Sequence, residues 1–405
     1  MKNNYRITLL FNANKAYDRQ IIKGIGEYLQ ATQCHWDIFF EEDFCTHLDN
    51  IQEWVGDGII ADLDNPEIER LLSQLTIPVV GIGSSYQDED DYPFMPYIAT
   101  DNTSLVSSAF NHLKDKGLEN FAFYGLPESH NTRWAVEREK AFNQIIENEE
   151  YSSSVYRGHR TTPQTWQDDM GHLADWLQSL PSPVGIIAVT DARARHLLQQ
   201  CDHLNLMVPD KVAIIGIDNE ELTSYLTHVS LSTVGQGCKK MGYAAAKLLH
   251  NQLITSSKSE IVVDPDEIET DITYPRIIVP AEEVFERQSS DFQAVNDPYV
   301  IKAMHYIRNN AFNGIKVDQV LDALTISRSN LETRFKEERG HSVHQEIHNS
   351  KLKRACELLA STNIAIAELP ALCGYPSLQY MYSVFKKDIN MTPKEYRISH
   401  AHSLS

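Results

Sequence analysis

Two stretches near the end of the sequence combine polar side chains with a repeated helical pattern. They read ISRSNLETRFKEERG (326–340) and CGYPSLQYMYSVFKKDINMTPKEYR (373–397). In each, a serine at the predicted N-cap position begins an amphipathic helix that ends in Phe-Lys. Leu331 with Phe335, and Met381 with Phe385, are i,i+4 pairs that must face inward. The other face of each helix is then free to enter a DNA major groove, which is ~12 Å wide.

Basic residues recur at the same places in both stretches. The runs are Arg328, Arg334, Lys336 and Arg339, then Lys351, Lys353 and Arg354, then Lys386, Lys387, Lys394 and Arg397. Such runs are often no more than solvated helix faces, but their recurrence favours binding to DNA phosphates.

The total charge argues in the opposite direction. The 405 residues include 56 acidic and 36 basic side chains, a net charge of −20, whereas DNA binding needs a positive surface. From residue 290 onward, however, 14 Lys/Arg stand against 12 Asp/Glu, a net of +2, so the preceding part carries −22. This uneven split predicts two parts with different partners.

The first 280 residues alternate short apolar runs with amphipathic stretches, which predicts βαβ units and parallel sheets covered by helices. Strands are expected at 6–11, 36–40, 58–61, 78–82, 120–124, 153–156, 185–189, 211–216 and 277–279. Helices are expected at 19–30, 48–55, 66–75, 101–116, 133–147, 165–180, 192–204 and 239–253. Two consecutive doubly wound halves would leave a cleft where the carboxyl ends of the strands meet.

The remaining sequence predicts helices alone. Asp297-Pro298 combines an N-cap with Pro at the first helical position, and 392–395 is a capping box. Further helices are expected at 317–324, 328–338, 343–360, 366–373 and 377–387. The expected domains are a two-lobed sensor (1–285) with an acidic surface insertion (254–275), a linker (286–297), and an all-α domain with two helix–turn–helix units (298–399).

The stretch 298–397 resembles the AraC-type DNA-binding domain. Its second unit has the pattern GF/Y-x-S-x-x-Y-F/M-x-x-x-FKK-x-x-x-x-TP-x-x-YR, matched in order by Gly374-Tyr375, Ser377, Tyr380-Met381, Phe385-Lys386-Lys387, Thr392-Pro393 and Tyr396-Arg397. The resemblance implies that bases are contacted by Ser329, Asn330, Glu332 and Thr333, and by Leu378, Gln379, Tyr382 and Ser383. It also implies phosphate-binding or fold-supporting roles for Lys336, Lys386 and Arg397, and the basic run adds Arg328. Each of these has a plain alternative as an exposed helix position without a role.

Two positions depart from that family's pattern. Thr325 stands in the first turn, where the family usually has Gly and a positive φ is favoured. Pro370 falls inside an expected helix, where it removes a backbone hydrogen bond; a helix beginning near Leu369 would avoid this.

Residues 6–285 resemble the fold shared by LacI-type regulators and periplasmic sugar-binding proteins. Five segments carry the resemblance: IATDN (98–102), EREKAF (137–142), AVTD (188–191), IGID (215–218) and STVGQ (232–236). The resemblance implies that the ligand is faced by Arg138, Thr190, Asp218 and Gln236, and is reached by Asn12, Asn14, Ala16 and Tyr17. Thr190 replaces the usual Asn, so Asp191 is a candidate for the same role.

These side chains suit a neutral polyol. Asp218 accepts from adjacent hydroxyls, Arg138 donates a planar fork, and Gln236 does both. Tyr17, Trp134 or Trp166 could cover the apolar face of a sugar, although the two tryptophans fit a packing role better. Asp101 and Asp191 also fit as helix N-caps.

Other classes of site find little support. Gly24-x-Gly26 and Gly81-x-Gly83 lack the third glycine of a dinucleotide motif, and no GxxxxGK, HExxH or GxSxG occurs. His35, His112 and His159 have no ligand spacing, so no metal or cofactor is expected. Six scattered cysteines indicate a reducing compartment. The short apolar run 7–11 fits no signal peptide, and no run approaches a membrane span, so we expect a cytoplasmic protein.

The whole chain resembles bacterial regulators of xylose operons in ITLLFNANKAYDRQ, YIATDN, FAFYGLPES, IIAVTDARARH, IGIDNEEL and GYPSLQY. That resemblance implies a transcriptional activator with D-xylose as effector, a DNA operator, RNA polymerase and a second copy in a homodimer as partners. The residues alone specify only a small polyol, so another pentose or polyol is the alternative. A transport solute-binding protein and a sugar hydrolase are rivals; the last hundred residues oppose the first, and no paired acid and base supports the second.

Overall fold

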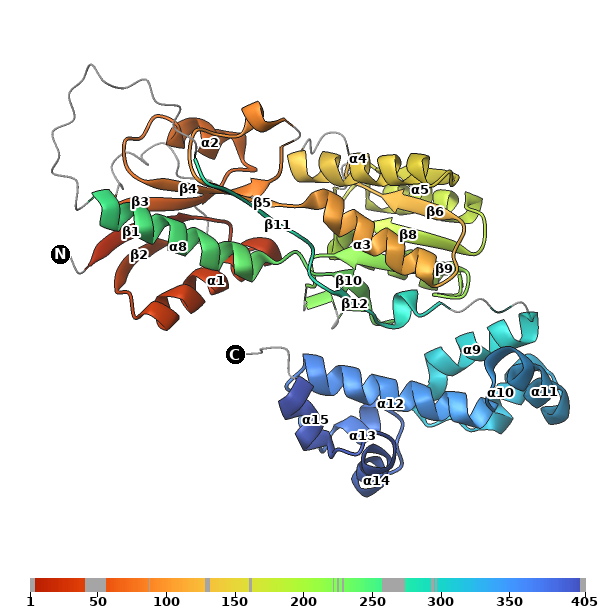
Figure 1. Ribbon diagram of the computed structural model, residues 1–405. Helices are drawn as coiled ribbons and strands as arrows, with labels where there is room; N and C mark the ends of the chain where they lie inside the picture. Colours follow the sequence, from red (N-terminus) through yellow and green to blue (C-terminus); the bar gives the residue numbers. More distant parts are fainter. Residues whose placement is uncertain are drawn as a thin grey trace, which may run out of the picture.

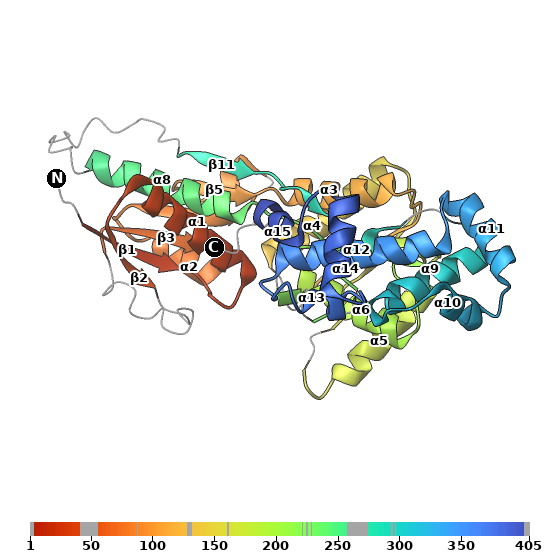
Figure 2. The ribbon, with the colours of Figure 1, turned by 90° about the horizontal axis from the view of Figure 1, so that it is seen from below.

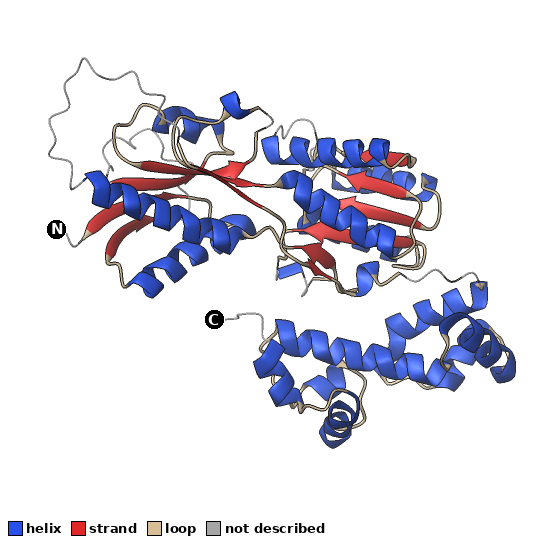
Figure 3. Ribbon diagram, viewed as in Figure 1, coloured by secondary structure: helices blue, strands red, loops and turns tan. Residues whose placement is uncertain are grey.

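The structure is a computed structural model that describes residues 4–40, 56–86, 88–127, 132–159, 162–220, 222–223, 226–227, 229–256, 274–292, 295 and 297–400. Within these ranges the chain forms two α/β lobes and one helical domain (Figure 1). Figure 3, coloured by secondary structure, distinguishes the lobes from the helical domain, because every described strand lies in the lobes. The predicted helix at 48–55 and most of the predicted insertion at 254–275 lie outside the described residues.

The first lobe, the N-lobe, is a parallel six-stranded sheet of order β11-β5-β4-β3-β1-β2. Its strands are β1 (Tyr5–Leu10), β2 (Trp36–Phe40), β3 (Gly58–Asp62), β4 (Val79–Ser84), β5 (Tyr97–Thr100) and β11 (Arg276–Val279). Its helices are α1 (Ala16–Thr32), α2 (Pro66–Leu72) and α8 (Cys238–Ser256). β3 and β4 are buried along their whole length, as expected for strands covered on both faces.

The second lobe, the C-lobe, is a six-stranded sheet of order β12-β10-β9-β8-β6-β7. Its strands are β6 (Phe121–Tyr124), β7 (Ser153–Tyr156), β8 (Val184–Ala188), β9 (Val212–Ile217), β10 (Ser232–Val234) and β12 (Val284–Phe285), the last antiparallel to β10. Its helices include α3 (Asn102–Asp115), α4 (Arg133–Asn148), α5 (Trp166–Ser179) and α6 (Asp191–His203).

The prediction of two consecutive halves was wrong in its connectivity. α8 and β11 return to the N-lobe after β10, so the chain passes between the lobes three times. β5, β10 and β12 were missed; β10 and β12, of three and two residues, are too short to show a hydrophobic period.

The return of α8 depends on close contact with α1. A Cβ at Gly24 would lie 2.0 Å from the carbonyl O of Lys239, and one at Gly242 would lie 2.0 Å from that of Ile21. The two helix backbones therefore touch, and each glycine makes room for the other helix. Gly24-x-Gly26, which offered a weak dinucleotide motif, has a packing role at its first position.

We expect Gly24→Ala to lower the free energy of unfolding by about 1–3 kcal/mol, because the added methyl forces the helices apart. Gly26→Ala is the matched control: no atom lies within 4 Å of its Cβ position, and alanine favours a helix by about 0.5–1 kcal/mol. Urea unfolding measures both changes. Equal effects of the two substitutions would contradict the close crossing.

The helical domain contains α9 (Pro298–Asn310), α10 (Val317–Leu324), α11 (Arg328–Arg339), α12 (Val343–Ser361), α13 (Leu369–Leu372), α14 (Leu378–Asp388) and α15 (Pro393–His400). It has two hydrophobic cores. α12 supplies Val343 and Ile347 to the first and Leu358 and Leu359 to the second, so one helix joins both helix–turn–helix units (Figure 2).

The predicted N-terminal caps of α9 and α15 are confirmed, whereas the helix predicted at 366–373 is shorter, Leu369–Leu372. Asp297 accepts hydrogen bonds from the backbone N–H groups of Tyr299 and Val300, and Thr392 and Glu395 form the reciprocal capping box. Thr325 has a left-handed φ of 53°, the conformation for which Gly is favoured. α13 begins at Leu369, as its proline requires.

The segment expected as a linker starts within the C-lobe. Ser289 and Ser290 are fully buried, and Phe292 belongs to the C-lobe core. The Ser289 hydroxyl donates to the carbonyl O of Ile214 at 2.6 Å and accepts from the N–H of Ser232 at 2.8 Å. The helical domain is thus attached to the C-lobe through a packed segment.

Candidate ligand cleft and DNA-binding helices

A cavity of about 290 Å³ lies between the two lobes. It is lined from the N-lobe by Asn14, Lys15, Ala16, Tyr17, Asp62, Asp64, Ser84 and Thr100, and from the C-lobe and the crossovers by Asn102, Trp134, Arg138, Thr190, Ala192, Asp218, Glu220 and Gln236. Most of these residues lie just after a strand or at the start of a helix, which is where ligands bind in parallel α/β sheets.

The structure brings together seven of the nine predicted ligand residues: Asn14, Ala16, Tyr17, Arg138, Thr190, Asp218 and Gln236. Asn12 and Asp191 do not line this cavity. The backbone N–H of Asn12 donates to Asp18, and its side chain accepts from the N–H of Asn14. Asp191 is buried beneath, where its carboxylate accepts from the Thr233 hydroxyl at 2.6 Å and the Glu220 N–H at 2.8 Å.

The N-cap role predicted for Asp191 belongs to Thr190, whose hydroxyl accepts from the N–H of Arg193. Asp101 does cap α3, accepting from the N–H of Ser104 at 2.8 Å. The Thr190 hydroxyl thus already has a structural partner at the edge of the cavity.

Arg138 is a buried support for the other polar groups. Its Nε donates to Asn102 at 2.9 Å, its Nη1 to the carbonyl O of Val189 at 2.6 Å, and its Nη2 to Gln236 at 2.9 Å. Burial lowers the pKa of the guanidinium, and Asp218 opposes this at 3.9 Å. Its position is therefore fixed before any ligand enters.

Asp218 is the carboxyl group that can respond to a ligand. Gln236 Nε2 donates to its Oδ1 at 2.5 Å. Burial raises the pKa of Asp218 to about 8, although Arg138 lowers it. Burial also raises the pKa of Asp18 to about 7 and raises that of Asp62. Near-neutral carboxyl groups of this kind suit an uncharged ligand with hydroxyl groups better than an anion.

Residues of the N-lobe were the largest omission. Asp62 and Ser84 are the last residues of β3 and β4, Asp64 follows β3, and Lys15 Nζ lies 3.3 Å from Asp62 Oδ2. These residues could have been predicted as ligand contacts from their position at the carboxyl ends of predicted strands, where ligands bind in parallel α/β sheets. Thr100, Asn102, Ala192 and Glu220 were missed as well.

One tryptophan combines its expected packing role against the C-lobe core with a place in the cavity wall. Trp134 lines the cavity, with the Arg138 guanidinium 4.9 Å from its ring centre. Trp166 does not line it and instead contacts His196, with ring centres 5.6 Å apart. Trp134 is thus the tryptophan placed to cover an apolar sugar face.

Ion pairs tie the lobes together across the cleft. Arg133 donates to Asp64 at 2.8 Å and to the Tyr97 hydroxyl at 2.9 Å. Its guanidinium lies 3.7 Å from the ring centre of Tyr86. Arg19 of the N-lobe bonds Glu220 of the C-lobe at 3.0 Å. The lobes are therefore held in contact on both sides of the cavity.

The predicted recognition helices are α11 and α14, near opposite ends of α12 (Figures 1 and 2). Leu331, Phe335, Met381 and Phe385 are fully buried, which confirms the predicted inner faces. The outer faces expose Arg328, Ser329, Asn330, Thr333 and Lys336 on α11, and Leu378, Gln379, Ser383 and Lys386 on α14. Glu332 and Tyr382 are partly buried.

Several of these side chains have partners within the domain. Glu332 accepts from the N–H of Val343 at 3.3 Å, and Asn330 accepts from Arg334 at 2.6 Å. Arg397 donates to the carbonyl O of Ile364 at 2.6 Å, the contact of a fold-supporting residue. Gln379 has an exposed amide on α14, at a position suited to bidentate pairing with adenine.

The structure also groups three residues able to ligate a metal. The ligand atoms of His159, Asp169 and His172 lie within 4.8 Å of one another on the C-lobe. Thr165 donates to Asp169 at 2.9 Å. Sequence spacing missed the group because His159 comes from a loop and the others from α5. None of the three lines the ligand cavity.

A two-lobed α/β cleft joined to two helix–turn–helix units defines a ligand-responsive transcription regulator. Family models agree segment by segment: a XylR N-terminal domain matches residues 6–103, a periplasmic binding protein-like domain 110–290, and a helix–turn–helix domain 320–399. No helix among the described residues has the length and apolar character needed to cross a membrane.

Comparison of the whole chain with known proteins identifies its family more specifically than the three domain matches do. It is 58% identical to the xylose operon regulatory protein of Escherichia coli (strain K12) over 97% of both chains, and 50% identical to that of Haemophilus influenzae over 98% of both. The chain belongs to the family of xylose operon regulatory proteins. A solved structure of a xylose-binding transcription activator, xylR, matches with a TM-score of 0.85 and 55% identity, over 99% of this chain and 100% of that one.

A LacI family regulator from Enterococcus faecium with bound ribose matches at 17% identity and a TM-score of 0.54, over 72% of this chain and 100% of that one. This similarity shows the fold of the two lobes.

Proposed function

We propose that this chain is a D-xylose-responsive transcriptional activator of genes for xylose catabolism and transport. The observation that carries the proposal is the 290 Å³ cavity between the lobes. In it, Asp218 can accept hydrogen bonds from sugar hydroxyls, Gln236 can donate them, and Trp134 can cover the apolar face of one small sugar. Relatives named xylose operon regulatory protein, aligned over nearly the whole chain, support xylose as the sugar. The proposed ligand residues in the cavity are Asn14, Tyr17, Arg138, Thr190, Asp218 and Gln236. Asn12 and Asp191, which do not line it, would act by holding Asn14 and the Glu220 backbone.

The second half of the proposal is operator binding through α11 and α14. Gln379 would pair with adenine and Glu332 with the amino group of cytosine, while Lys336 and Lys386 would bind phosphates. The remaining proposed DNA contacts are Arg328, Ser329, Asn330, Thr333, Leu378, Tyr382 and Ser383. A cytoplasmic homodimer that recruits RNA polymerase and catalyses no reaction completes the proposal. The 116 residues from 290 onward carry a net charge of +2, compared with −22 before them, which supports DNA contact through this domain.

The experiment is a thermal-shift panel of D-xylose, L-arabinose, D-ribose, D-xylulose and xylitol. A bound ligand raises the melting temperature by mass action, so D-xylose is expected to give the largest shift. A larger shift with another pentose or with xylitol would transfer the proposal to that ligand. Recovery of D-xylose unchanged after incubation separates a sensor from a sugar-converting enzyme.

Operator binding is tested by selection from a library of random DNA duplexes. The full chain is expected to enrich one sequence, and D-xylose is expected to change its affinity for that duplex. Failure to enrich any duplex, with or without sugar, would contradict the regulator proposal.

A further inference from the structure

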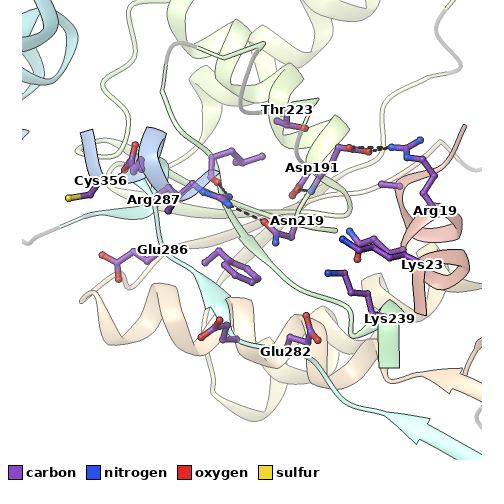
Figure 4. Close-up of a pocket in the computed structure, with 18 of the residues that line it drawn as sticks. Arg19, Lys23, Asp191, Asn219, Thr223, Lys239, Glu282, Glu286, Arg287 and Cys356 are labelled. Atoms are coloured by element: carbon purple, nitrogen blue, oxygen red, sulfur yellow. Dashed lines mark hydrogen bonds and ion pairs between the residues drawn. The ribbon is translucent and has the colours of Figure 1, made fainter. Parts of the chain in front are cut away.

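Arg287 lies between the C-lobe and the helical domain, and it bonds Asn219, the residue after Asp218 of the ligand cavity. Its backbone N–H donates to Ser232 Oγ at 2.8 Å, and its carbonyl O accepts from the same hydroxyl at 3.0 Å. Its Nη1 donates to the carbonyl O of Leu231 at 2.6 Å, and its Nη2 to Asn219 Oδ1 at 3.0 Å (Figure 4). Its backbone is thus fixed to β10 while its side chain reaches toward the cleft.

Asn219 belongs to a strained loop at the base of the cleft. It follows Asp218, and both residues have positive φ, 51° for Asn219 and 136° for Asp218. Such conformations cost on the order of 1–3 kcal/mol for residues other than glycine and persist only where the surroundings hold them. Here Gln236 holds Asp218, Thr233 Oγ1 accepts from the Asn219 N–H at 3.1 Å, and Arg287 holds the Asn219 side chain.

Arg287 also faces the helical domain. It lines a second cavity, of about 1020 Å³, together with Asn219 of the loop and Cys356 and Glu357 of α12. Figure 4 shows Arg287 between Asn219 and the α12 segment that carries Cys356. Burial raises the pKa of Glu357, while Lys353, Arg354, a hydrogen bond with Ser230 and, last, the charge of Arg287 lower it. Arg287 is thus one of several groups near this carboxyl group.

Two other ion pairs fasten the helical domain to the C-lobe. Lys353 of α12 bonds Asp291 at 2.6 Å, and Arg308 of α9 bonds Asp210. Neither Asp291 nor Asp210 lines the ligand cavity or bonds the strained loop in the described part of the chain. These pairs hold the domain in place, whereas Arg287 bonds Asn219 in the loop beside Asp218 and lines the same cavity as Cys356 and Glu357 of α12.

We propose that Arg287 is the positioning residue through which occupancy of the cleft changes the position of the DNA-binding helices. A ligand that bonds Asp218 pulls on the strained loop, the loop moves the Arg287 side chain through Asn219, and Arg287 moves α12 through Glu357. Because α12 belongs to the cores of both helix–turn–helix units, both recognition helices follow. This inference depends on the proposed function as a sugar-controlled DNA-binding protein.

The experiment compares Arg287→Met and Glu357→Gln with the unmodified full chain. The readout is the ratio of affinities for the selected duplex with and without saturating D-xylose, measured by fluorescence anisotropy, beside D-xylose affinity from calorimetry. The unmodified chain is expected to show at least a fivefold ratio, the lower end of typical allosteric coupling. Each variant is expected to reduce the ratio below about twofold while its D-xylose affinity stays within about threefold. The double variant should be no worse than either single variant, because both act on one connection.

Lys116→Met is the matched control. Lys116 pairs with Glu286, the residue before Arg287, at 2.7 Å, but it does not line the cavity of Figure 4. The Lys116→Met variant is expected to keep the full ratio of duplex affinities with and without D-xylose.

The outcomes separate the two proposals. If the unmodified chain responds to sugar and both Arg287→Met and Glu357→Gln respond equally, the inference is overturned and the proposed function stands. If the unmodified chain binds neither sugar nor duplex, the proposed function is contradicted, and the inference that depends on it is contradicted as well. If Arg287→Met does not fold, Glu357→Gln decides alone, since its substitution lies outside the sensor lobes.

Discussion

At pH 9, where Asp218 with its raised pKa of about 8 is ionised, replacing it by asparagine is expected to weaken D-xylose binding by about 10- to 100-fold, the range that hydrogen bonds to a charged group provide. The carboxylate can accept from two adjacent hydroxyls, whereas the amide offers one acceptor oxygen and one donor. The amide keeps the shape of the side chain and can still accept from Gln236, which now bonds Asp218 Oδ1 at 2.5 Å. The measurement is isothermal titration of D-xylose into the full chain.

The same substitution is expected to change the pH dependence of stability. The pKa of Asp218 is raised from 3.8 to about 8 in the folded chain, so the folded state holds this proton over a window in which the unfolded state has lost it. Its contribution to the free energy of unfolding is therefore complete below pH 4 and is lost as the pH rises through 8. An amide at this position cannot ionise, so the Asp218→Asn variant loses this slope and becomes more stable relative to the natural chain above pH 8.

The pH dependence of binding should follow the same group. Since the ionised carboxylate is the stronger acceptor, D-xylose affinity is expected to rise between about pH 6 and 9 in the natural chain and to rise less in Asp218→Asn, where Asp62 remains as a cavity carboxyl group with a raised pKa. Asp101→Asn is the control, because Asp101 caps α3 outside the cavity and asparagine caps equally well. Sugar affinity that is unchanged by Asp218→Asn would remove Asp218 from the binding site.

Replacing Phe385 by alanine is expected to destabilise the second helix–turn–helix unit by about 3–5 kcal/mol. Phe385 is fully buried among Leu369, Met381 and Val384, and its ring centre lies 6.0 Å from that of Tyr396. This core is small, so the cavity left by the ring is a large fraction of it. We expect affinity for the selected duplex to fall by more than about a hundredfold, because α14 loses its fixed position.

D-xylose binding should survive Phe385→Ala, because its core is separate from the cores of the lobes. Lys386→Ala is the neighbouring control: this side chain is 55% exposed, so the fold should persist. It should weaken duplex binding uniformly across sequences and reduce its salt dependence. Circular dichroism in urea and anisotropy at several salt concentrations measure both variants. Phe385→Ala with native duplex affinity would show that α14 is not needed for DNA binding.

The parts of the fold that were predicted from sequence are those determined by local patterns. The inward positions of Leu331, Phe335, Met381 and Phe385 follow from helical spacing alone, and the caps at Asp297 and Thr392 follow from side-chain chemistry. The exchange of α8 and β11 between lobes could not be predicted in this way, because it depends on contact between helices more than 200 residues apart.

The residues of the cleft also fall into two groups, those that could be predicted from the sequence and those that depend on how the lobes meet. Resemblance to known families identified Arg138, Asp218 and Gln236, which the structure places together. Asp62 and Asp64 follow a strand like many others, and only the meeting of the two lobes turns that strand end toward a ligand. Asp191 shows the converse: its neighbours in sequence suggested a ligand role, but Thr233 and the Glu220 N–H enclose its carboxylate one layer below.

The threefold passage of the chain between the lobes has a consequence for synthesis on the ribosome. The N-lobe core needs Met241, Leu249 and Val279 in addition to the first strands, and the C-lobe core takes Phe292 from beyond them. A nascent chain of about two hundred residues therefore holds five of the six N-lobe strands and three of the six C-lobe strands but can close neither core. Both lobes are completed within the same short interval of translation, just before the helical domain emerges. A message cut within the sensor region thus yields no half-sensor able to bind sugar, only an open chain for chaperones and proteases.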